Sequence, residues 1–152
     1  MLKILFPAKF DNVFRGYKFS LWAFYALTAV TLWRSQHHMF APDGGAQSIG
    51  NIPLDTYSQG ASNTIINIFA FWGLSQMIIG LLYLLACLRY KSMIPLFYLL
   101  AAIEYFTRFG QMGFFRSLGE SGLPPGVLIN LPFTTIMLIL LFLSTKSPRG
   151  VS

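Results

Sequence analysis

Four long apolar runs, separated by short polar or glycine-rich stretches, dominate the sequence. They cover about residues 18–40, 63–88, 93–115 and 127–144. A helix of roughly 20 residues crosses the hydrocarbon core of a bilayer. The pattern therefore predicts an all-α membrane protein, with residues 1–152 folded as a single antiparallel four-helix transmembrane bundle.

Polar residues at the end of the first run belong to the same predicted helix. Its purely apolar part, residues 19–33, is only about 15 residues long and is too short to cross a bilayer. The helix must therefore continue through Arg34, His37 and His38 to about residue 40.

The segment before the first run has a weaker helical signal. Phe10, Phe14 and Tyr17 follow helical spacing after Pro7. This spacing predicts a short amphipathic helix over residues 7–17, lying in the membrane interface.

Residues 41–62 and 116–126 are predicted to be loops, because both are rich in glycine, proline and other turn-forming residues. The first loop is long for a compact protein. Such length is typical of a loop that covers a site or contacts a partner.

Charged residues make up only 11% of the chain, and 55% of its residues are hydrophobic, which is not typical of a soluble domain. The cations concentrate before the first run, between the second and third, and after the fourth: Lys3, Lys9, Arg15, Lys18, Arg89, Lys91, Lys146 and Arg149. By the positive-inside rule, both termini are cytoplasmic and both loops lie outside. We therefore expect a multi-pass protein of the cytoplasmic membrane. The net charge of +6 does not point to nucleic acid, because no basic helix with interleaved aromatic residues is present.

Glu104, Arg108 and Gln111 stand out within the third run. Their spacings of four and seven residues place them on one face of a helix. A charged residue in the middle of a membrane costs about 2.5–3.5 kcal/mol on insertion scales, so this face should point into the protein or into a wet cavity.

The predicted orientation places most other intramembrane polar residues in the same outer half, with Gln76 the deepest. These residues are Arg34, His37, His38, Asn67, Gln76, Asn130 and Thr134. Two interpretations compete. Glu104 and Arg108 either pair with each other and fix the bundle register, or line an outward-opening pocket for a lipid or small molecule.

Three small residues recur every seven positions in the second run: Gly73, Gly80 and Cys87. They predict a stripe on which another helix packs closely. Cys87 is the only cysteine, so an intramolecular disulfide is impossible.

No metal site or cofactor is predicted. His37 and His38 are adjacent and point about 100° apart on a helix, so they cannot both bind one ion in the usual geometry. The chain has no other histidine to complete a bis-histidine haem site.

Two stretches, residues 40–49 and 71–76, are followed by the basic turn at 89–95. Together they resemble a group of small, uncharacterised four-span membrane proteins of bacteria, similar in layout to DoxX-like proteins. The resemblance implies the four-helix layout and assigns no reaction.

No catalytic motif is recognisable, which favours a non-enzymatic protein with an outward-facing polar pocket. We expect it to contact membrane lipid and to act as a homo-oligomer or as an accessory subunit of a larger membrane complex. Two alternatives remain: a small secondary carrier with Glu104 as the coupling carboxylate, and a small membrane enzyme with Glu104 as an acid beside a histidine.

Overall fold

The computed structural model describes residues 2–110 and 125–146, and these residues form helices and no strands. The prediction of an all-α protein is confirmed. The elements, in chain order, are α1 (Leu2–Leu5), α2 (Lys18–Phe40), η1 (Leu54–Thr56), α3 (Gln59–Leu88), η2 (Lys91–Met93), α4 (Ile94–Gly110) and α5 (Pro125–Thr145). The end of the predicted third span and most of the second loop, residues 111–124, lie outside the described residues.

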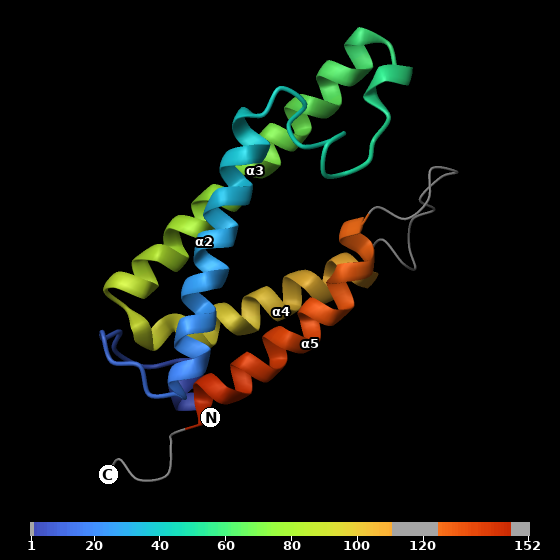
Figure 1. Ribbon diagram of the computed structural model, residues 1–152. Coiled ribbons are helices and arrows are strands. Elements are labelled where there is room, and N and C mark those ends of the chain that lie inside the picture. The colour runs from blue at the N-terminus through green and yellow to red at the C-terminus, as the bar shows by residue number, and fades with distance from the viewer. Residues whose placement is uncertain (1, 111–124, 147–152) are drawn as a thin grey trace.

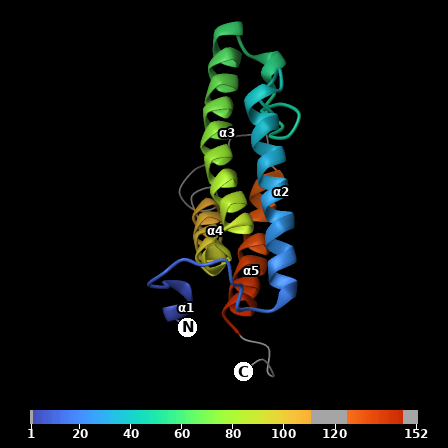
Figure 2. The same cartoon turned by 90° about the vertical axis from the view of Figure 1, so that its left-hand side faces the viewer.

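The four long helices form two antiparallel hairpins, α2 with α3 and α4 with α5 (Figure 1, Figure 2). The hairpins meet at the end of the molecule that holds the N-terminus, the turn between α3 and α4, and the end of α5. They diverge toward the other end, where the loop between α2 and α3 lies (Figure 1). We call the first end the base of the molecule.

An aromatic layer joins the two hairpins near the base. The ring of Phe24 in α2 lies 5.2 Å from that of Tyr83 in α3 and 5.3 Å from that of Tyr98 in α4. Phe97 contacts both Phe24 and Tyr83, with ring centroids 6.2 and 5.1 Å apart. The hydroxyl of Tyr98 donates a hydrogen bond of 2.6 Å to the carbonyl of Ser20, so the buried phenol is satisfied.

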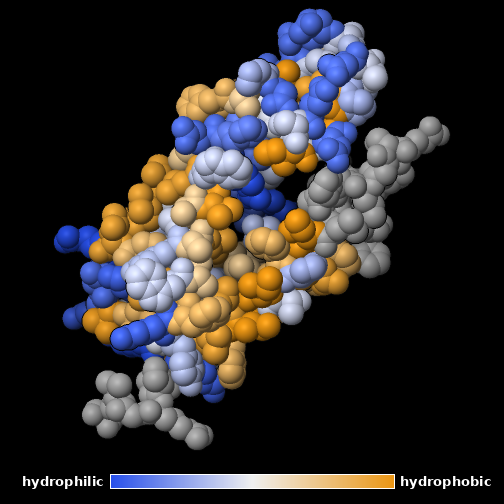
Figure 3. Space-filling view, viewed as in Figure 1, coloured by the Kyte–Doolittle hydropathy of each residue, from blue (hydrophilic) through white to orange (hydrophobic). Residues whose placement is uncertain are grey.

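Large apolar side chains point outward on all four long helices. Trp22 is 67% exposed, Phe71 70%, Phe106 61% and Phe142 57%. Polar side chains lie inside instead: Ser20, Thr28, Ser35, His38, Gln76, Asn130 and Thr134 are all buried. On the face drawn in Figure 3, a hydrophobic band separates two hydrophilic ends. Exposed apolar surface of this extent is uncommon on a soluble monomer.

Within the described residues, α3 alone is both long and apolar enough to cross a membrane. Only 22% of its most apolar window is buried inside the protein. The apolar part of α5, Ile129–Thr145, is shorter.

The small residues of α3 face α2. A Cβ added to Gly73 would lie 2.7 Å from the Cβ of His38, and one added to Gly80 would lie 2.8 Å from a methyl of Leu32. The thiol of Cys87 is 3.4 Å from the hydroxyl of Thr28. These close approaches allow α2 and α3 to pack along most of the length of α2.

The prediction of a helix over residues 7–17 is wrong. The segment is irregular, and only Leu2–Leu5 before it is helical. The reason is a set of contacts with distant residues. The N–H of Asp11 donates to Ser92 Oγ at 2.9 Å, and the Ser92 hydroxyl donates back to the Asp11 carbonyl at 3.0 Å. At the end of the segment, the N–H of Tyr17 donates to the carbonyl of Leu143 in α5. These backbone groups are therefore not available to a local helix.

Gly73→Ala should destabilise the α2–α3 hairpin, because the new methyl would press on the Cβ and backbone of His38. We expect a loss of about 1–3 kcal/mol in the free energy of unfolding, measured by circular dichroism in dodecyl maltoside titrated with SDS. Gly60→Ala is the matched control, because the same helix has open space at that position. Equal stability of the two variants would contradict the described packing.

Candidate ligand-binding site between the helical hairpins

A chain of polar side chains connects three helices where the hairpins begin to diverge. Arg34 of α2 donates from Nη2 to Gln76 Oε1 of α3 at 3.2 Å. Gln76 in turn donates from Nε2 to Glu104 Oε1 of α4 at 3.0 Å. Arg108, one turn further along α4, forms an ion pair with the same carboxylate. We call these four residues the polar cluster.

The indole of Trp72 packs against the polar cluster from α3. The guanidinium carbons of Arg34 and Arg108 lie 5.8 and 5.2 Å from the centre of its ring, which is the range of cation–π attraction. The ring of His38 lies 4.7 Å from the same indole. Trp72 therefore brings Arg34, His38 and Arg108 to one aromatic surface.

Three buried nitrogens near this surface have no hydrogen-bond partner within residues 2–110 and 125–146: Arg34 Nε, His37 Nε2 and His38 Nε2. His38 is only 2% exposed, so bulk solvent does not reach its Nε2. A buried polar atom without a partner costs about 1–3 kcal/mol. Such atoms are expected where a bound molecule completes the hydrogen bonds.

The hydrogen bonding of His38 defines what such a molecule would offer. Its Nδ1 lies 2.7 Å from the carbonyl of Gly44. A carbonyl only accepts, so the proton of the neutral ring is on Nδ1 and Nε2 carries a lone pair. The unpartnered Nε–H of Arg34, one turn earlier on α2, is a donor. A group that both donates and accepts, such as a hydroxyl, matches this pair.

The loop after α2 holds the ring of His38 in place. Gly44 and Gly45 have φ angles of 59° and 74°, and a Cβ at Gly45 would lie 2.8 Å from His38 Nδ1. Asp43 accepts backbone N–H bonds from Gly45 at 2.9 Å and Ser48 at 2.7 Å. Partial burial raises the pKa of Asp43, but these hydrogen bonds outweigh it and lower the pKa to about 2. The loop is therefore a fixed cover over His38.

The structure brings together most of the residues that the sequence proposed, but not all. Asn67 is exposed on α3. Asn130 and Thr134 are buried in α5, where the Thr134 hydroxyl donates to the Asn130 carbonyl of its own helix at 2.8 Å. Gln111 lies outside the described residues.

Trp72 was not predicted as part of the site. It lies four residues before Gln76, and this spacing would have placed both on one helix face. A tryptophan among apolar residues is not recognisable in the sequence as part of a polar site. Its contact with two guanidiniums is visible only in the structure.

No group of three His, Cys, Asp or Glu side chains in the described part of the chain is placed to hold a metal ion. Comparison with known protein families, curated proteins and solved structures finds no match to this chain. The resemblance to DoxX-like proteins therefore stays a prediction, and any functional assignment depends on the chemistry of the site.

Replacing Glu104 should show how much its charge and its hydrogen bonding each contribute to the stability of the fold. Glu104→Ala removes the acceptor for Gln76 and leaves Arg108 without its counter-ion, and it should lower the free energy of unfolding by about 1–3 kcal/mol. Glu104→Gln keeps an acceptor oxygen and should lose less. The same SDS titration measures both variants, and Glu104→Ala with parental stability would show that the polar cluster does not hold the hairpins together.

Proposed function

We propose that this chain is a four-span membrane protein with both termini in the cytoplasm. The outward-facing apolar side chains of α2, α3, α4 and α5 support all four crossings, because a bilayer would remove them from water. The buried serines, threonines and glutamine fit the same environment, since polar groups are costly in contact with lipid tails.

The charges at the two ends support this orientation. Lys3, Lys9, Arg15, Arg89 and Lys91 all belong to segments at the base, whereas the opposite loop carries Asp43 and Asp55 and no cation. Cytoplasmic segments of membrane proteins are enriched in lysine and arginine. The base is then cytoplasmic, and the loop over His38 is outside.

We further propose that the polar cluster binds a hydroxyl-bearing ligand, either a lipid headgroup or a small polar molecule, from the outer side. The observation that carries this function is the pair of buried, unpartnered nitrogens, Arg34 Nε and His38 Nε2. A cluster built only to fix helix register would satisfy its own donors and acceptors.

The aromatic layer favours binding over transport. Phe24, Tyr83 and Phe97 each lie about two to three helical turns closer to the base than their helix's member of the polar cluster. Their rings pack together in the buried hydrophobic core between Glu104 and the base. A carrier needs access from both sides, whereas a binding protein needs it from one.

The orientation can be tested by cysteine labelling in a Cys87→Ala background, because Cys87 is the only cysteine. A membrane-impermeant maleimide should label Ser48→Cys in intact bacterial cells, since Ser48 is exposed in the loop over His38. Arg89→Cys, exposed between α3 and α4, should react only after permeabilisation. Recovery of the protein in the soluble fraction, or labelling of both sites in intact cells, would contradict the proposed crossings.

Ligand binding can be tested by mass spectrometry of molecules that co-purify with the protein in detergent. Arg34→Gln removes a charged donor and should reduce the amount of bound molecule about tenfold. Arg89→Gln is the control, because it removes an exposed cation at the end of α3, about three and a half helical turns from Gln76. An empty parental protein, or equal retention by Arg34→Gln, would contradict the binding function.

A further inference from the structure

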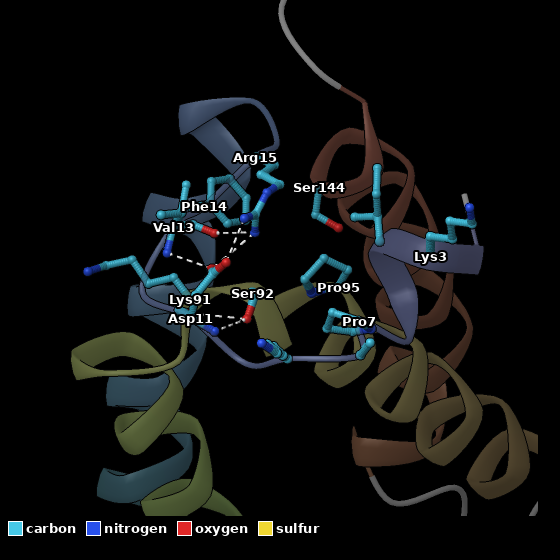
Figure 4. Close-up of a pocket in the computed structure, with 13 residues that line it drawn as sticks. Lys3, Pro7, Asp11, Val13, Phe14, Arg15, Lys91, Ser92, Pro95 and Ser144 are labelled. Atoms are coloured by element: carbon cyan, nitrogen blue, oxygen red, sulfur yellow. Dashed lines mark hydrogen bonds and ion pairs between the residues drawn. The ribbon is translucent and has the colours of Figure 1, made fainter.

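A cavity lies at the base, away from the polar cluster. It has a volume of about 270 Å³ and is formed by α1, the irregular segment before α2, the start of α4 and the end of α5. In Figure 4, Asp11 and Arg15 line one side, Pro7 and Pro95 lie below, and Ser144 is on the side toward Lys3. We call this cavity the basal pocket.

Positive charge dominates the basal pocket. Its lining includes four cations, Lys3, Lys9, Arg15 and Lys91, and one carboxylate, Asp11. Arg15 is paired with that carboxylate at 2.6 Å, so the two charges largely cancel. The hydrogen bonds from Arg15 and from the Val13 N–H hold the pKa of Asp11 below its ordinary value, which keeps the pair ionised at neutral pH.

The remaining lysines supply the excess charge. Lys91 donates to Asn12 Oδ1 at 2.9 Å and is therefore already partly satisfied. Lys3 and Lys9 are exposed and form no hydrogen bond or ion pair with the described residues. Both have the flexible ammonium groups that commonly bind phosphate as point charges.

The walls of the basal pocket are mixed in character. Ile4, Pro7, Phe14 and Pro95 contribute apolar surface beside the lysines. An entirely polar ion would not use this surface, whereas a phosphate attached to an apolar molecule would contact both parts. Basic pockets on the cytoplasmic side of membrane proteins are suited to phospholipid headgroups.

We propose that the basal pocket binds a phosphate group, with Lys3 and Lys9 as its principal ligands. The phosphate can come from an anionic phospholipid at the membrane surface or from a free phosphate compound in solution. Only the lipid source depends on the proposed cytoplasmic position of the base. Phosphate binding itself can be measured in detergent, whichever side of the membrane the base faces.

The test is titration of the full-length protein in neutral detergent with short-chain phosphatidylglycerol, followed by native mass spectrometry. We expect the double variant Lys3→Gln/Lys9→Gln to weaken binding about tenfold or more, as loss of two surface-facing phosphate contacts predicts. The matched control is Lys18→Gln/Arg89→Gln, which removes two cations outside the pocket lining and should change binding less than about twofold.

Further titrations identify the source of the phosphate. Short-chain phosphatidylcholine, which has no net charge, should bind more weakly than phosphatidylglycerol. If inorganic phosphate at a comparable concentration displaces phosphatidylglycerol, the basal pocket binds a soluble phosphate compound. If it does not, the pocket binds a lipid headgroup. Unchanged binding in Lys3→Gln/Lys9→Gln, or equal weakening in the control variant, would overturn the proposal.

Discussion

Gln76 is the residue on which the arrangement of the two hairpins depends most directly. Its single amide accepts from Arg34 on α2 and donates to Glu104 on α4, so one side chain connects three helices. The aromatic layer also joins the two hairpins, through the ring contacts of Phe24, Phe97 and Tyr98. An amide suits this position because it offers both a donor and an acceptor without adding charge to a group that already holds two guanidiniums and one carboxylate.

The sequence predicted the long helices well and the irregular segments poorly. The bounds of α2 match the expected run 18–40. The expectation of a helix over residues 7–17 failed because the backbone of Asp11 bonds to Ser92, which is 81 residues away. Periodicity reports local spacing and contains no information about such a distant partner.

The candidate site was also predicted only in part. Spacing along α4 indicated that Glu104 and Arg108 share a face, and the ion pair is present. Spacing could not show that Gln76 lies between Arg34 and Glu104, because that depends on how three helices are rotated about their axes. Asn67 illustrates the limit: it has the same chemistry as the polar residues of the site, but it faces outward.

The loop residues Gly44 and Gly45 together determine the position and the tautomer of the His38 ring. Any side chain at Gly45 would collide with the ring of His38, and the neighbouring Gly44 carbonyl fixes the ring proton on Nδ1. If the loop lifted, Nδ1 would lose its acceptor and the proton could move to Nε2. The position of this loop therefore determines which nitrogen of the buried ring donates and which accepts, so a molecule that displaced the loop would also change the hydrogen bonding available inside the protein.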